Sequence, residues 1–108
     1  MSQQRKPDGN RQRDERTALL ESVLQARSDI LWREVDGEIV ALDPHRGYYY
    51  GIEGAGMRIW ELLQRPTTFQ TLLRILRDEY NVEEQQLRAD LVSMCERLER
   101  CHLIEQCS

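Results

Sequence analysis

The sequence lacks any apolar run long enough to cross a membrane. A membrane-spanning helix needs about 20 consecutive apolar residues, and no such run occurs among the 108 residues. The opening residues, MSQQRKPDGN, also lack the apolar stretch of a secretory signal. We therefore expect a cytoplasmic protein that has no membrane partner.

A surplus of basic residues is missing as well. The net charge is −4 at pH 7, and residues 30–108 contain nine Lys and Arg residues against fourteen Asp and Glu residues. Binding to nucleic acid through its phosphates needs the opposite balance. The composition therefore argues against a nucleic-acid partner.

The cysteines form neither a disulfide framework nor a familiar metal site. Cys95, Cys101 and Cys107 all lie near the end of the chain, and no two of them form a CxxC pair. His45 and His102 add no recognisable ligand spacing. We expect no bound metal, and we interpret Cys95 as a small core residue on a helix.

Motifs of catalysis and of phosphate binding are also absent. Gly51, Gly54 and Gly56 do not have the GxGxxG spacing, and no Lys-Ser/Thr pair follows them. No serine stands in a GxSxG motif. A chain of this length has one modest core and little room for a deep pocket. We therefore expect a binding module with no cofactor, and not an enzyme.

The residues that are present form three stretches, of which residues 1–29 are the first. Residues 1–13 are polar with nothing to bury, which predicts disorder. After Asp14, four apolar residues recur at helical spacing and predict a possible short helix: Leu19, Leu20, Val23 and Leu24. This N-terminal extension would either pack against the domain of residues 30–108 or serve as a docking helix for a partner enzyme.

The second stretch, residues 30–52, predicts three strands. Asp36-Gly37 separates two apolar-rich runs, and Asp-Gly is a strong hairpin signal because both central residues of a type I′ turn need positive φ. A second turn at residues 44–47 leads to a short aromatic strand, residues 48–52. This third strand of an antiparallel meander has one covalent neighbour, so its other side is a candidate open edge. Such an edge can capture an extended peptide, or it can simply be an edge.

The third stretch predicts three helices, over residues 55–64, from Thr67 or Thr68 to about Asn81, and over residues 83–100. Pro66 ends the first helix, and a threonine caps the second. The apolar stripe of the last helix is broader than one face needs. A block of strands followed by a block of helices is an α+β arrangement. The same elements occur in winged-helix domains, so a DNA-binding regulator remains an alternative.

Two segments resemble the PqqD family. The run WREVDGEIVALD (Trp32–Asp43) is similar to the opening hairpin of that family, and GYYYGIEGAGMRIWELL (Gly47–Leu63) is similar to its strand-to-helix segment, Gly-x-Tyr-Phe-x-Leu-Asn-x-x-Gly-x-x-Ile-Trp. Further residues fit its last-helix pattern: Asp90, Met94, Cys95, Leu98 and Leu103-Ile104. The resemblance covers residues 30–105, about three-quarters of the chain.

The resemblance implies a recognition element for ribosomally made, modified peptides. Such proteins bind the leader of a precursor peptide as an added strand, in a cleft against the last helix, and deliver it to a modifying enzyme. The implied pairing edge is Tyr48, Tyr49, Tyr50, Gly51 and Ile52. The implied cleft lining is Leu87, Leu91, Met94, Cys95 and Leu98, although some of these must face the core instead.

The resemblance is strongest to the discrete leader-binding proteins of lasso-peptide clusters, which work with a separate leader peptidase. PqqD itself, which serves a radical enzyme in quinone-cofactor synthesis, is a further alternative, as is a scaffold subunit that does not touch the substrate. The chain departs from the family pattern at three positions. Glu53 replaces the Asn that commonly caps the first helix, Gly54 replaces a frequent Pro, and His102 replaces a Gly just past the last helix, where a left-handed conformation is expected.

Overall fold

Three antiparallel strands form the meander that the sequence predicts. In the computed structural model, which describes residues 22–107, β2 (Leu31–Val35) pairs with β3 (Glu38–Asp43), and β3 pairs with β4 (Tyr48–Ile52). Asp36 and Gly37 join β2 to β3 with φ angles of 53° and 83°. Because a type I′ turn needs positive φ at both central residues, the predicted hairpin is confirmed.

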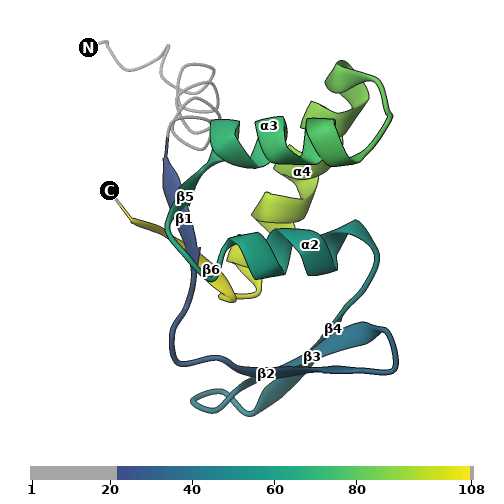
Figure 1. The fold of residues 1–108 in the computed structure, drawn as a ribbon. Coiled ribbons are helices and arrows are strands. Elements are labelled where there is room, and N and C mark those ends of the chain that lie inside the picture. Colours follow the sequence, from purple (N-terminus) through teal and green to yellow (C-terminus); the bar gives the residue numbers. More distant parts are fainter. Residues whose placement is uncertain (1–21, 108) are drawn as a thin grey trace, which may run out of the picture.

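Three helices lie on one side of this sheet (Figure 1). They are α2 (Ala55–Leu62), α3 (Phe69–Glu79) and α4 (Glu84–Arg100). The Thr68 hydroxyl accepts a hydrogen bond of 3.1 Å from the Thr71 N–H, so Thr68 is the predicted cap of α3. The α+β prediction is confirmed, because the helices follow the meander and cover one face of it.

The start of α2 differs from the family pattern in its backbone. The N-cap is Gly54, with φ 62° and ψ −140°, and no side chain caps this end of the helix. The expectation that Glu53 occupies the capping position is therefore wrong. Proline holds φ near −65°, so the Pro that is common at this position in the family does not fit the backbone of Gly54.

The core lies between the meander and the helices. Along β3, Ile39 and Ala41 are fully buried while the residues between them are half-buried, so alternate side chains point at the helices. Trp60 of α2 is fully buried and meets Trp32 of β2 edge to face, with ring centroids 6.1 Å apart. The helices contribute further fully buried side chains: Leu63, Phe69, Leu72, Leu76, Leu91 and Cys95.

A second, small sheet lies beside the helices and was not predicted. Its order is β5-β1-β6, where β1 is Val23–Ala26, β5 is Thr67–Thr68 and β6 is Ile104–Cys107. Val23 and Leu24, which the sequence analysis places on a possible helix, therefore lie in a strand. Two partner strands satisfy the backbone of β1 and bury Leu24, and this tertiary pairing overrides the local helical spacing. Residues 1–21 lie outside the described residues, so the disorder, the rest of the helix and the division of the chain at residue 29 remain predictions.

Candidate functional site

The open edge that the sequence predicts is the free side of β4. Among the described strands the sheet order is β2-β3-β4, so β3 is the only strand that pairs with β4. A strand with one partner presents unpaired N–H and C=O groups along its other side. These groups can accept an additional strand without any change in the fold.

The five edge residues alternate between two faces of the sheet. Ile52 is buried and Tyr50 is half-buried, while Tyr49 is 71% exposed. Tyr48 stands on the same face as Tyr50, and their rings meet edge to face with centroids 6.4 Å apart. One side of β4 therefore faces the helices, and Tyr49 and Gly51 face outward.

The structure divides the five predicted residues of α4 into two groups. Leu91, Cys95 and Leu98 are buried in the core, with exposures of 4% or less. Leu87 and Met94 are half-buried and pack against the edge of that core. They are seven residues apart, so they lie on the same side of the helix. Of the five, only Leu87 and Met94 keep apolar surface that a bound peptide could contact.

Two observations relate the inner face of β4 to α4. At the end of β4, Ile52 and Met94 both approach Gly56 of α2, where a Cβ would lie 3.1 Å from Ile52 Cγ2 and 3.5 Å from Met94 Sδ. Near Tyr50, the interaction is with Cys101, which caps the C-terminal end of α4. Burial, followed by the nearby Cys101 thiol, raises the pKa of Tyr50 above 10, although Arg46 opposes the shift. The strand thus lies alongside the C-terminal half of α4.

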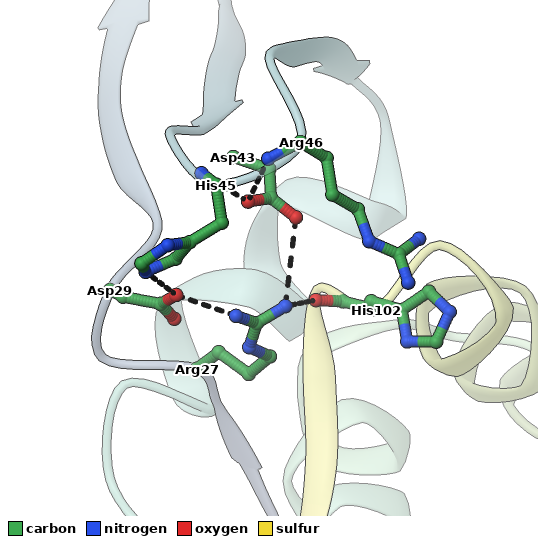
Figure 2. A network of polar contacts seen from close by, with 6 residues as sticks. All are labelled: Arg27, Asp29, Asp43, His45, Arg46 and His102. Carbon is green, nitrogen blue, oxygen red and sulfur yellow. Dashed lines mark hydrogen bonds and ion pairs between the residues drawn. The ribbon is translucent and has the colours of Figure 1, made fainter.

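The turn that leads into β4 is organised by Asp43. Its Oδ1 accepts hydrogen bonds from the N–H groups of His45 (3.0 Å) and Arg46 (3.2 Å) (Figure 2). Its backbone carbonyl accepts one from Gly47 (2.7 Å). Burial by itself would raise the pKa of Asp43. The two N–H donors and the charge of Arg27 outweigh it, so the pKa of Asp43 lies below its ordinary value. The carboxylate is therefore charged at neutral pH and holds the turn in place.

The Cys95 thiol is buried in the core and not activated. Burial raises the pKa of Cys95 to about 12, so this thiol is protonated at neutral pH and is a poor nucleophile. No group of three or more His, Cys, Asp or Glu residues within 22–107 could hold a metal ion. Over the same range, no helix has the length and apolar character needed to span a bilayer.

Sequence reasoning missed three residues that shape this region. Cys101 is not among the predicted site residues, yet it stands seven residues after Met94, on the same side of α4, and interacts electrostatically with Tyr50. Asp43 could have been found from the Asp-Pro-His-Arg-Gly run, because an Asp before a turn commonly accepts from the next N–H groups. Arg27 carries no local signal for this role, since Asp43 and His102, two of its three partners, lie far away along the chain.

Comparison with known proteins places this geometry in a family. The family model described as "Coenzyme PQQ synthesis protein D (PqqD)" matches residues 38–104, which include β3, β4, all three helices and the turn after α4. The chain belongs to the PqqD family. The resemblance inferred from the sequence is thereby confirmed at the family level, and the PqqD match identifies the chain as a non-catalytic binding domain.

A solved structure of a similar protein carries a bound peptide. The structure described as "TbiB1 in Complex with the TbiA(beta) Leader Peptide" matches this PqqD-family chain with a TM-score of 0.70 and 25% sequence identity. The match covers 78% of this chain and 98% of that chain. Among curated proteins, none matches.

Proposed function

We propose that this PqqD-family chain binds the leader segment of a ribosomally synthesised precursor peptide and presents it to a modifying enzyme or leader peptidase. The observation that carries the proposal is the free edge of β4 beside the half-buried Met94 of α4. Backbone groups of β4 would bind the leader as a fourth strand, and its alternate side chains would contact α4. The bound leader in the TbiB1 structure supports this function.

The proposed site uses five residues of β4 and part of α4. Tyr48, Tyr49, Tyr50, Gly51 and Ile52 supply the pairing edge. Leu87 and Met94 supply apolar contacts. Leu91, Cys95 and Leu98 support these contacts from the core, because their burial anchors α4 there.

The enzyme that receives the leader defines two candidate roles. A lasso-peptide role, with a separate leader peptidase as partner, is favoured because the sequence is most similar to the discrete leader-binding proteins of those clusters. The match to the PqqD model favours a second candidate, a chaperone for a radical enzyme. Co-elution with each neighbouring enzyme, in the presence of leader, separates the two roles.

The first experiment is a titration by fluorescence anisotropy. The probe is a labelled synthetic peptide with the leader sequence of a precursor encoded beside this chain. We expect saturable binding at micromolar or lower concentration, which a scrambled peptide does not show. Absence of binding by the folded protein to every neighbouring leader would refute leader recognition and favour the scaffold alternative.

A pair of adjacent variants tests the site itself. Met94→Glu places a charge at a half-buried position beside Gly56, which Ile52 at the end of β4 also approaches. Desolvating that charge against an apolar leader is unfavourable. Ser93→Glu makes the same change of charge at an exposed neighbour. We expect Met94→Glu to weaken leader binding by at least about tenfold, which is about 1.4 kcal/mol, and Ser93→Glu to leave it within about twofold. Equal affinities for the two variants would place the leader elsewhere.

A further inference from the structure

Arg27 lies where three distant parts of the chain meet. It follows β1, and its backbone N–H donates a hydrogen bond of 2.9 Å to the carbonyl of Leu103. Its own carbonyl accepts a hydrogen bond of 3.3 Å from the N–H of Ile30. The backbone of Arg27 is therefore fixed on both sides, and its side chain starts from a defined position.

The guanidinium of Arg27 contacts three oxygens (Figure 2). Nη1 donates a hydrogen bond of 2.8 Å to the carbonyl of His102 and lies 3.6 Å from Asp43 Oδ2. Nη2 donates a hydrogen bond of 2.5 Å to Asp29 Oδ2, which also lies 3.2 Å from His45 Nε2. A planar guanidinium can serve several oxygens at once, which a lysine ammonium on a flexible stem does less well.

Two of these oxygens belong to residues next to the elements that flank the proposed peptide site, Asp43 of β3 and His102 just after α4. Asp43 pairs with Tyr48, the first residue of β4. His102 directly follows Cys101, the residue at the end of α4 that interacts with Tyr50. Arg27 therefore ties the start of β4 to the C-terminal end of α4, although it belongs to neither.

The ion pair with Arg27 compensates the buried charge of the Asp43 carboxylate. Asp43 is fully buried, and its Oδ2 accepts no hydrogen bond within the part of the chain that the structure describes. The charge of Arg27 compensates this oxygen from a distance of 3.6 Å. Without Arg27, this buried charge would lose its ion-pair partner and keep only the charge of Arg46, so the surrounding turn would have to move toward solvent or another donor.

We propose that Arg27 is a positioning residue that sets the spacing between β4 and the C-terminal end of α4. For leader binding, this inference rests on the function proposed above. Neighbouring strands lie about 4.8 Å apart, so a leader strand that pairs with β4 and also contacts α4 needs a defined space between them. A loss of this spacing weakens leader binding without removing any group that touches the leader.

The test compares two arginine-to-methionine variants. Arg27→Met removes the three contacts and keeps most of the side-chain volume. The matched control is Arg58→Met, which removes one positive charge and the ion pair of Arg58 with Glu79 (2.7 Å) between α2 and α3. The anisotropy titration with the neighbouring leader measures affinity, and denaturant unfolding measures the stability of both variants. We expect affinity to fall by about tenfold or more in Arg27→Met and by less than about twofold in Arg58→Met.

A second readout needs no leader. Nuclear Overhauser effects between the Tyr50 ring and Cys101 report the spacing at the end of α4, and those between Gly56 and Met94 serve as an internal reference. We expect Arg27→Met to weaken the first set and to keep the second, whereas Arg58→Met keeps both. Unchanged effects in Arg27→Met would overturn the inference whether or not any leader binds. An unchanged affinity, with wild-type protein that does bind, would overturn it and leave the proposed function standing.

A conservative variant covers the case in which Arg27→Met does not fold. Arg27→Lys keeps the charge near Asp43, but it cannot reach the three oxygens in one planar arrangement. We expect its leader affinity and its Tyr50–Cys101 effects to lie between those of wild type and those expected for Arg27→Met. Wild-type values for both in Arg27→Lys would show that a point charge is enough, which would contradict the role given to the guanidinium.

Discussion

At the residue scale, His102 has a backbone conformation that glycine adopts most easily. Its φ is 60°, and it stands just past the end of α4. The His102 N–H donates to the Glu99 carbonyl (2.9 Å), and the Leu103 N–H donates to the Leu98 carbonyl (3.0 Å). These two bonds form a Schellman motif, which needs a left-handed residue at this position. The left-handed conformation expected from the family's Gly is therefore confirmed.

Replacement of His102 by glycine should stabilise the protein. A left-handed residue other than glycine costs roughly 1 kcal/mol of strain, which glycine would relieve. Part of this gain in stability is offset because glycine is more flexible in the unfolded chain. We expect His102→Gly to raise the free energy of unfolding by about 0.5 kcal/mol in urea titrations. Gly37→Ala is the opposite control, because Gly37 has φ 83° and alanine should lose about 1 kcal/mol there. A destabilised His102→Gly would mean that the imidazole makes a favourable interaction larger than the backbone strain.

At the element scale, local sequence patterns predict β2 to β4 and the three helices because each is specified by neighbours in sequence. The Asp36-Gly37 turn fixes one hairpin, and Pro66 with Thr68 separates two helices. The strands β1, β5 and β6 carry no comparable signal, since each has four residues or fewer. Their pairing joins Val23 to Thr68 and Cys107, and contacts so distant in the sequence are not visible in local periodicity.

The candidate site, like the fold, is predicted by the sequence only in part. The aromatic strand after a turn identifies the β4 edge, and the structure keeps it free of a second partner within residues 22–107. The apolar residues of α4 identify the facing helix, but a broad stripe does not say which members are buried. Packing decides this point, and it assigns Cys95 to the core and Met94 to a half-buried position beside Gly56 of α2.

Strand addition makes an element-scale prediction about amide exchange. In a strand, successive N–H groups point in opposite directions, so alternate amides of Tyr48–Ile52 face away from β3. We expect saturating leader to slow hydrogen exchange at these alternate amides, by up to about 100-fold when its concentration is about 100 times Kd. The outward amides of β2, the other edge strand, are the control and should not change. Protection on β2 instead of β4 would place the leader on the opposite edge.

At the scale of the whole molecule, the Asp43 carboxylate helps to hold the two sheets together. Asp43 ends β3 of the meander, while Arg27 follows β1 of the small sheet. The charged and titratable groups around Asp43 come from two connecting segments, the one between β1 and β2 (Arg27 and Asp29) and the turn between β3 and β4 (His45 and Arg46). An acid that is ionised more easily when folded than when unfolded stabilises the fold only while it is charged.

The protein should therefore lose stability in acid through Asp43. Because its folded pKa lies below the ordinary value of 3.8, the contribution is complete above that value and disappears as the pH falls through the folded pKa. Asp43→Asn keeps an oxygen for the turn N–H groups but has no charge to lose. We expect this variant to be less stable than wild type at pH 7, and the difference to shrink steadily below about pH 4. Urea unfolding between pH 2.5 and 7 measures this difference, and Glu105→Gln, at an exposed residue of β6, controls for the loss of one negative charge. A stability difference that stays constant across this range would show that Asp43 acts through hydrogen bonds alone and that its charge contributes nothing.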